Sequence, residues 1–195
     1  MEQATVPFEK LVELTPSLAT KLSILRAVDE PLATMSVESI CRKCGVSRQT
    51  FYHHFKSKYD IVFWFTDLCQ TFYLDEIGRS YTWFEGFFKH YTLLCTEREF
   101  LTYTVAKKPI QTNHYDLQRK HEHRKKTLIQ TLVEYQHAEL TDLLLFQISA
   151  FVYMESEMAR RWFNEGLAKS PRVFAREMES VVPHQLYLLL NGGVG

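Results

Sequence analysis

Polar side chains that can donate and accept hydrogen bonds concentrate on one short stretch of the chain. On a helix with 100° per residue, Gln49, Tyr52 and His53 fall within about 100° of one another. Phe51 and Phe55 lie one turn apart on the opposite face. A short helix with two aromatic anchors and a polar outer face can enter a DNA major groove. An ordinary amphipathic pair of surface helices would give the same pattern.

Two short helices joined by a tight turn must position these side chains. Ser36 is a suitable N-cap for the first helix, and Ser47 is one for the second. Gly45 lies where the first helix must end, at a position that favours a left-handed conformation. One face of the first helix is small and apolar and should pack on a core; it carries Val37, Ile40, Cys41 and Cys44. The stretch therefore predicts a helix-turn-helix unit.

Charge is distributed unevenly along a chain whose net charge is zero. Residues 36–60 carry a local charge of +3, which fits local contact with phosphates. Arg48 at the start of the second helix, and Lys56 and Lys58 after it, can reach phosphate groups. The DNA contacts that we expect come from Ser36, Arg42, Ser47, Arg48, Gln49, Thr50, Tyr52, His53, His54, Lys56 and Lys58.

The segment GVSRQTFYHHFKSK resembles the recognition-helix signature of the tetracycline-repressor (TetR) family of bacterial transcription factors. The matching positions are Gly45, Val46, Ser47, Phe51, Tyr52, His54, Phe55 and Lys58. Upstream, SVESICRKC is similar to the preceding helix of the family, with Ile40 in its buried position. The resemblance covers about residues 20–62. It implies a one-component repressor that binds a palindromic operator as a homodimer and leaves it when a small effector binds.

The sequence also resembles a subgroup of that family that includes activators of dihydroxyacetone kinase operons. The sign of regulation, repression or activation, therefore stays open. Double-stranded operator DNA, a second copy of the chain and an effector are the expected partners.

The composition predicts an all-α protein, since it is 46% hydrophobic with only 7 Gly and 6 Pro. We expect two domains and about nine helices in a TetR-like arrangement. Residues 1–58 would form a three-helix DNA-binding domain, and residues 59–195 a helical bundle for dimerisation and ligand binding. The expected helices outside the motif are residues 16–29, 59–77, 80–95, 97–105, 114–136, 140–164 and 171–191, the last interrupted at Pro183.

Nearly half of the aromatic residues fall between Phe63 and Tyr103. They could line a pocket for an apolar or aromatic effector, or they could form the core of the bundle. The candidate pocket residues are Trp64, Phe72, Trp83, Phe87 and Tyr91.

The helix expected over residues 140–164 is apolar on nearly every face, so it should be buried on every face. One side can pack on its own domain and the other on a second subunit. The candidate dimer contacts are Leu145, Phe151, Val152 and Trp162. By contrast, the basic run from Arg119 to Lys126 indicates a solvated helix face.

Two spacings could indicate metal or redox chemistry. Cys41 and Cys44 form a CxxC pair without a second pair or a following histidine pair, so core thiols in a reducing cytoplasm explain them better. Glu134 and His137 have the ExxH spacing of di-metal helical bundles, which require a second such motif. A metal-binding bundle protein or enzyme that uses this pair is the alternative hypothesis.

Otherwise we expect no enzymatic activity, cofactor or metal. The N-terminal residues lack the apolar segment of a signal peptide. The longest apolar run, residues 143–154, is too short to cross a bilayer. These features predict a cytoplasmic protein that does not enter membranes.

Overall fold

The computed structural model describes residues 15–96 and 114–191 of the 195-residue chain. These residues form nine α-helices and no named strand, which confirms the predicted all-α class. They divide into two compact units, residues 15–68 and residues 69–95 with 114–191. The helix expected over residues 97–105 lies outside the described residues. The domain boundary after residue 58 stays a prediction.

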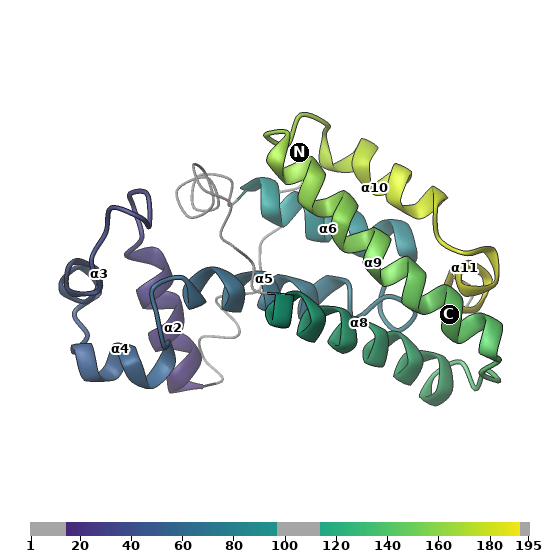
Figure 1. The fold of residues 1–195 in the computed structure, drawn as a ribbon, viewed down its shortest axis with the longest axis horizontal. Coiled ribbons are helices and arrows are strands. Elements are labelled where there is room, and N and C mark those ends of the chain that lie inside the picture. Colours follow the sequence, from purple (N-terminus) through teal and green to yellow (C-terminus); the bar gives the residue numbers. More distant parts are fainter. Residues whose placement is uncertain (1–14, 97–113, 192–195) are drawn as a thin grey trace. The chain divides into compact units, whose positions relative to one another are not determined.

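The first unit contains α2 (Pro16–Arg26), α3 (Val37–Cys44), α4 (Arg48–His54) and the start of α5 (Asp60–Tyr73). Figure 1 shows α2, α3 and α4 gathered around one another. As predicted, α2 begins after an N-cap threonine, because the Thr15 hydroxyl accepts a hydrogen bond from the Leu18 N–H at 3.3 Å. It ends at Arg26, three residues earlier than expected.

Apolar side chains from these helices and their linkers form the core of the first unit. Buried members include Leu22, Ile24, Leu25, Leu32, Met35, Ile40, Cys41, Phe51, Phe55, Ile61 and Phe65. The rings of Phe51 and Phe55 lie 5.8 Å apart, and both are buried. This anchoring fixes which face of α4 points away from the core.

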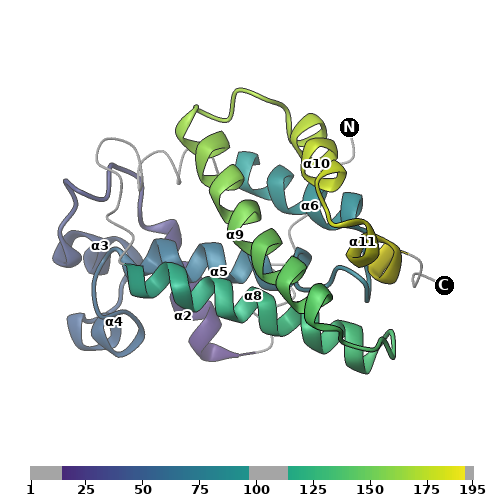
Figure 2. The same cartoon turned by 45° about the vertical axis from the view of Figure 1, so that its right-hand side comes forward.

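The second unit contains the end of α5 together with five further helices. These are α6 (Trp83–Thr96), α8 (His114–Glu134), α9 (Asp142–Asn164), α10 (Pro171–Ser180) and α11 (His184–Asn191). In two views α8 and α9 lie side by side (Figure 1, Figure 2), and α11 also packs against α9. The predicted interruption at Pro183 is confirmed, since it separates α10 from α11.

An aromatic core holds the second unit together. On α6, Trp83, Phe87 and Tyr91 follow one another at four-residue spacing and are all fully buried. The Tyr91 ring lies 5.2 Å from that of Trp162 and 4.7 Å from that of Phe174, which joins α6 to α9 and α10. In the described parts of the chain, no helix has the length and apolar character needed to cross a membrane.

Candidate functional site

A left-handed glycine makes the turn between α3 and α4. Gly45 has φ +72°, and the Val46 N–H donates to the Cys41 carbonyl at 3.1 Å, as in a Schellman ending. A Cβ at Gly45 would meet no atom within 4 Å, so the backbone conformation alone favours glycine there. Ser36 caps α3 by accepting the Ser39 N–H at 3.0 Å. These predicted turn and cap residues have the expected geometry.

Ser47 and Thr50 build the first turn of α4. The Ser47 hydroxyl accepts the Thr50 N–H at 2.9 Å, and the two hydroxyl oxygens lie 2.8 Å apart. Both residues were predicted to contact DNA. Their hydrogen bonds to each other fix where α4 begins, and therefore which side chains it directs outward.

The outward face of α4 carries hydrogen-bonding groups and little charge. Gln49, Tyr52 and His53 are exposed, and Tyr52 retains 48% of its accessible surface. The imidazole ring of His54 lies 5.1 Å from that of His53. Burial, together with the nearby His53 and Lys21, lowers the pKa of His54, which favours the neutral form of this side chain. Neutral donors and acceptors of this kind suit base edges better than phosphates.

Positive charge flanks this face. Arg42, Arg48 and Lys56 are exposed. Lys43 is different, because its ammonium forms an ion pair with Asp29 and lies 3.7 Å from Glu30. Its hydrogen bond to Asp29 raises the pKa of Lys43. The basic surplus that the sequence indicated is therefore partly neutralised within the unit.

Lys58, a predicted phosphate contact, binds the protein's own backbone. It is half-buried, and Nζ donates hydrogen bonds to the carbonyl oxygens of Ala33 at 3.1 Å and Met35 at 2.7 Å. The ammonium also lies 5.3 Å from the centre of the Tyr59 ring. No spacing in the sequence indicates these bonds, since they join residues 23 and 25 positions apart.

Trp64, predicted as a pocket residue, packs within the first unit. Its ring meets that of Phe55 edge to face at 5.8 Å. The Lys21 ammonium lies 5.6 Å from the Phe55 ring and 5.4 Å from the Trp64 ring, within cation–π range. This contact ties the end of α4 to α5, and the sequence pattern gave no sign of the role of Lys21.

The other candidate pocket residues lie in the second unit. Trp83, Phe87 and Tyr91 are core residues in contact with one another, and Phe72 is half-buried. The indole N–H of Trp83 and the hydroxyl of Tyr91 are buried without a hydrogen-bond partner in the described structure. Burial raises the pKa of Tyr91, so its hydroxyl stays protonated. An effector pocket at these residues stays a prediction.

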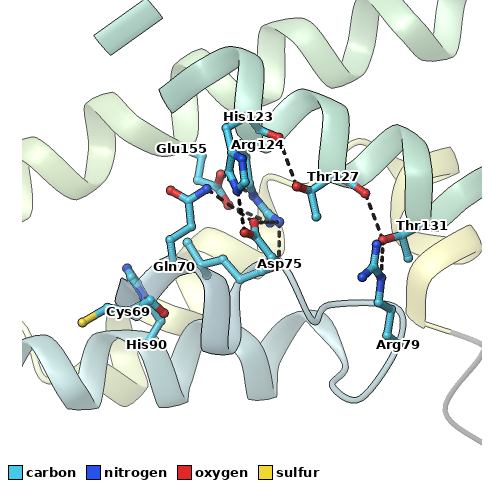
Figure 3. Close-up of polar contacts among 11 residues, drawn as sticks. Cys69, Gln70, Asp75, Arg79, His90, His123, Arg124, Thr127, Thr131 and Glu155 are labelled. Carbon is cyan, nitrogen blue, oxygen red and sulfur yellow. Dashed lines mark hydrogen bonds and ion pairs between the residues drawn. The ribbon is translucent and has the colours of Figure 1, made fainter. Parts of the chain in front are cut away.

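A buried arginine connects α8, α9 and the segment that follows α5 (Figure 3). Arg124 of α8 is 3% exposed and forms two hydrogen bonds with Glu155 of α9, at 3.0 and 3.2 Å. It also donates to the carbonyl of Leu74, one residue past the end of α5, at 2.5 Å. Asp75 lies 3.7 Å from Arg124 and 2.8 Å from Nε2 of His123. The solvated face predicted for this basic run therefore includes one buried member.

Three of the four candidate dimer residues belong to the protomer's own core. Phe151, Val152 and Trp162 are buried, and the Trp162 indole donates to the Lys169 carbonyl at 3.0 Å. These three side chains of α9 pack inside the protomer, whereas Leu145 is half-buried. Other apolar residues of α9 are exposed instead, namely Leu143, Phe146 and Tyr153.

The alternative metal site does not assemble in the described structure. Glu134 accepts a hydrogen bond from Gln130 at 2.9 Å, and His137 follows the helix end with φ +50°. Among the residues described, no group of three or more His, Cys, Asp or Glu side chains could hold a metal ion. Cys41 and Cys44 are free thiols on α3, and Cys41 is buried.

A comparison with protein families identifies the first unit. Residues 28–63 match the family model TetR_N, described as "Bacterial regulatory proteins, tetR family". The matched segment contains α3, the Gly45 turn, α4 and the first residues of α5. A search of curated proteins found no match. The resemblance to the subgroup that includes activators of dihydroxyacetone kinase operons stays a prediction. Residues 28–63 therefore match the helix-turn-helix domain of the tetR family, and this match supports a DNA-binding transcriptional regulator.

Proposed function

We propose that this protein is a homodimeric, effector-responsive repressor that recognises a near-palindromic operator with α4. One observation carries the proposal. Phe51 of α4 is fully buried, while Gln49 and Tyr52 on the other side of the same short helix are exposed. A helix held this way presents hydrogen-bonding side chains outward at fixed positions, as major-groove recognition requires.

Each exposed residue has a distinct task in this proposal. Gln49 pairs with a base edge, preferably adenine, because its amide offers both a donor and an acceptor. Arg42, Arg48 and Lys56 contact phosphates, which fixes position without specifying sequence. The hydroxyl of Tyr52 can reach either kind of group.

An exposed apolar row on α9 supports the homodimer. Leu143, Phe146 and Tyr153 are 61%, 72% and 57% exposed, and their spacing places them on one side of the helix. Large apolar side chains grouped on a surface favour a protein interface. In a two-fold dimer each α9 would meet its own copy, so the operator would share that symmetry.

The effector part of the proposal rests on the second unit. Buried Trp83 and Tyr91 each keep an unpartnered polar atom beside apolar ring surface. A small, largely apolar or aromatic effector with one or two polar groups would match this chemistry. It would have to rearrange the aromatic core to enter. Preference for the rearranged state would then release the protein from its operator.

Selection from a random pool of DNA duplexes tests the proposal. The purified full-length chain should enrich one sequence motif with two related halves. The matched control replaces Arg48, Gln49 and Tyr52 by alanine together, since all three are exposed and their removal leaves the core intact. This variant should enrich no motif. Enrichment of the same motif by both proteins would show that α4 does not recognise the site.

A further inference from the structure

The helix α4 is short, and its C-terminal end needs support from outside the helix. It has seven residues, and a helix of this length is marginal in water by itself. Its last carbonyl groups carry partial negative charge, which a nearby cation stabilises. The basic residues of its last turn are His53 and His54, and burial lowers the pKa of His54. A cation from another helix would therefore stabilise this end of α4.

Lys21 of α2 places its ammonium beside this end. Nζ lies 5.6 Å from the centre of the Phe55 ring and 5.4 Å from the centre of the Trp64 ring. Phe55 is the C-cap of α4 and Trp64 belongs to α5, so one cation contacts the end of α4 and α5 together. After burial and His53, the Lys21 ammonium also lowers the pKa of His54, which agrees with a charge close to the last turn of α4.

Two lysines near this end of α4 allow the roles of packing and charge to be separated. Lys21 is half-buried against the two rings, whereas Lys56, which directly follows Phe55, is exposed. Loss of either lysine removes one positive charge from the first unit. Loss of Lys21 also removes the contacts of its ammonium with Phe55 and Trp64, so Lys56 provides a matched control.

We infer that Lys21 is a positioning residue for DNA recognition, which holds the C-terminal end of α4 against α5 through Phe55 and Trp64. The inference rests on the proposed function of α4 and assigns a part in it to a residue of α2. Without the ammonium, the last turn of α4 should open more often. The exposed side chains of Tyr52 and His53 on that turn would then lose their fixed positions.

Amide hydrogen exchange in the free, full-length protein tests the contact itself. The Phe55 N–H donates to the Phe51 carbonyl at 2.9 Å, so its exchange rate reports opening of the last turn of α4. In Lys21→Met this amide should exchange about fivefold faster than in wild type, since cation–π contacts with two rings are lost. Lys21→Arg should keep the wild-type rate, because a guanidinium can occupy the same place over the rings.

Two controls make this exchange experiment specific. Lys56→Met should leave the Phe55 amide unchanged, because Lys56 is exposed. The Ile40 N–H, in the first turn of α3, should keep its rate in Lys21→Met. An unchanged rate at Phe55 in Lys21→Met would overturn the inference, and so would an equal increase at Phe55 and Ile40, which would indicate general destabilisation.

Affinity for the selected duplex tests the consequence for recognition. Lys21→Met should bind about fivefold more weakly than wild type, and Lys21→Arg should restore the affinity. In a Trp64→Leu background, Lys21→Met should cause a smaller loss, because one of the two rings is already missing. Equal losses in both backgrounds would show that Lys21 acts independently of Trp64, which overturns the inference. If the wild-type protein bound no duplex, the proposed function would fail, while exchange at Phe55 would still decide whether Lys21 holds the end of α4.

Discussion

Gln49 is the exposed residue of α4 whose amide can pair with a base edge at two points. We expect Gln49→Ala to relax preference at one base pair of the operator half-site, at a cost of roughly 1–3 kcal/mol for the cognate base. Affinities for the selected duplex and for its single-base variants measure the base preference at each position. The other positions should keep their preferences, because Arg48 and Tyr52 remain in place.

The matching control at this scale is Lys56→Ala. It should weaken binding to every duplex by a similar factor, since a phosphate contact carries no sequence information. Equal weakening of all duplexes by Gln49→Ala would contradict the base-contact role of Gln49.

His90 should make the stability of the second unit depend on pH. Burial lowers the pKa of His90 to about 4, and Nδ1 lies 3.3 Å from the Cys69 carbonyl. An unfolded histidine has a pKa of about 6.5, so between these values the unfolded chain binds more protons than the folded one. The free energy of unfolding should then decrease as the pH falls from about 6.5 to about 4, by up to about 3 kcal/mol. Above about pH 6.5 this group should have no effect.

Urea unfolding followed across this pH range measures the effect of His90. In His90→Gln the loss of stability at low pH should be smaller, whereas in the control His137→Gln it should match wild type, because His137 is exposed. An unchanged pH dependence in His90→Gln would show that another group titrates.

At the residue scale, local features could be predicted from the sequence and distant ones could not. The caps Ser36 and Ser47 and the turn at Gly45 depend on neighbours within a few positions. By contrast, the bonds of Lys58 and Arg124 join residues 23 to 50 positions apart. A charged residue in the sequence gives no indication that such a partner exists.

At the scale of single elements, α9 shows where a pattern stops being informative. A helix that is apolar all round must be buried, but the pattern does not say which side meets its own protomer. Phe151 and Val152 face the protomer core, while Leu143 and Phe146 are exposed. The helix predicted to continue to residue 77 ends earlier, since α5 ends at Tyr73. The next carbonyl, that of Leu74, accepts a hydrogen bond from Arg124, a partner that the local pattern does not indicate.

Phe146→Glu should separate dimerisation from folding. The side chain is 72% exposed in the protomer, so a glutamate there can remain solvated and the fold should persist. In a dimer the same charge would lose its hydration against apolar surface, so we expect a folded monomer. Light scattering gives the mass, and thermal unfolding shows whether the fold is kept.

The control for this prediction is Phe151→Ala. Phe151 is 2% exposed, so its truncation should cost about 3–5 kcal/mol of stability by leaving a cavity in the core. A fully dimeric Phe146→Glu protein would exclude this face of α9 as the interface.

The buried cluster around Arg124 should be strongly coupled. Arg124→Met leaves the carboxylate of Glu155 buried without its partner, which typically costs about 3–5 kcal/mol. Replacing both residues by methionine should destabilise the protein less than Arg124→Met alone, since the buried carboxylate of Glu155 is then removed together with its partner. Chemical unfolding of the two single variants and the double variant measures the coupling. Additive losses would mean that the two side chains do not interact.

At the scale of the whole molecule, α5 begins in the first unit and ends in the second. Trp64 in its first half contacts Phe55 at the end of α4. The residue after its last turn, Leu74, is bonded to Arg124. If an effector moved α5, Trp64 would move with it and would change the position of Phe55 at the end of α4. This movement is the step by which the proposed release from DNA would occur.

Reciprocity tests this coupling. A hundredfold loss of operator affinity on effector binding corresponds to about 2.7 kcal/mol, and operator DNA must then weaken effector binding by the same factor. Titrating candidate effectors with and without the selected duplex gives the dissociation constant of each effector for the free and the DNA-bound protein. Identical dissociation constants for every effector found would mean that Trp83, Phe87 and Tyr91 only pack in the core and do not form an effector site.

The central claim is that two copies of α4 contact successive major grooves on one side of a duplex. Hydroxyl-radical footprinting and base-methylation interference on the selected duplex test it most directly. We predict two protected half-sites whose centres lie about one helical turn apart or somewhat more, with interference at guanine N7 in the major groove of each. A single protected half-site, or interference confined to the minor groove, would contradict this account.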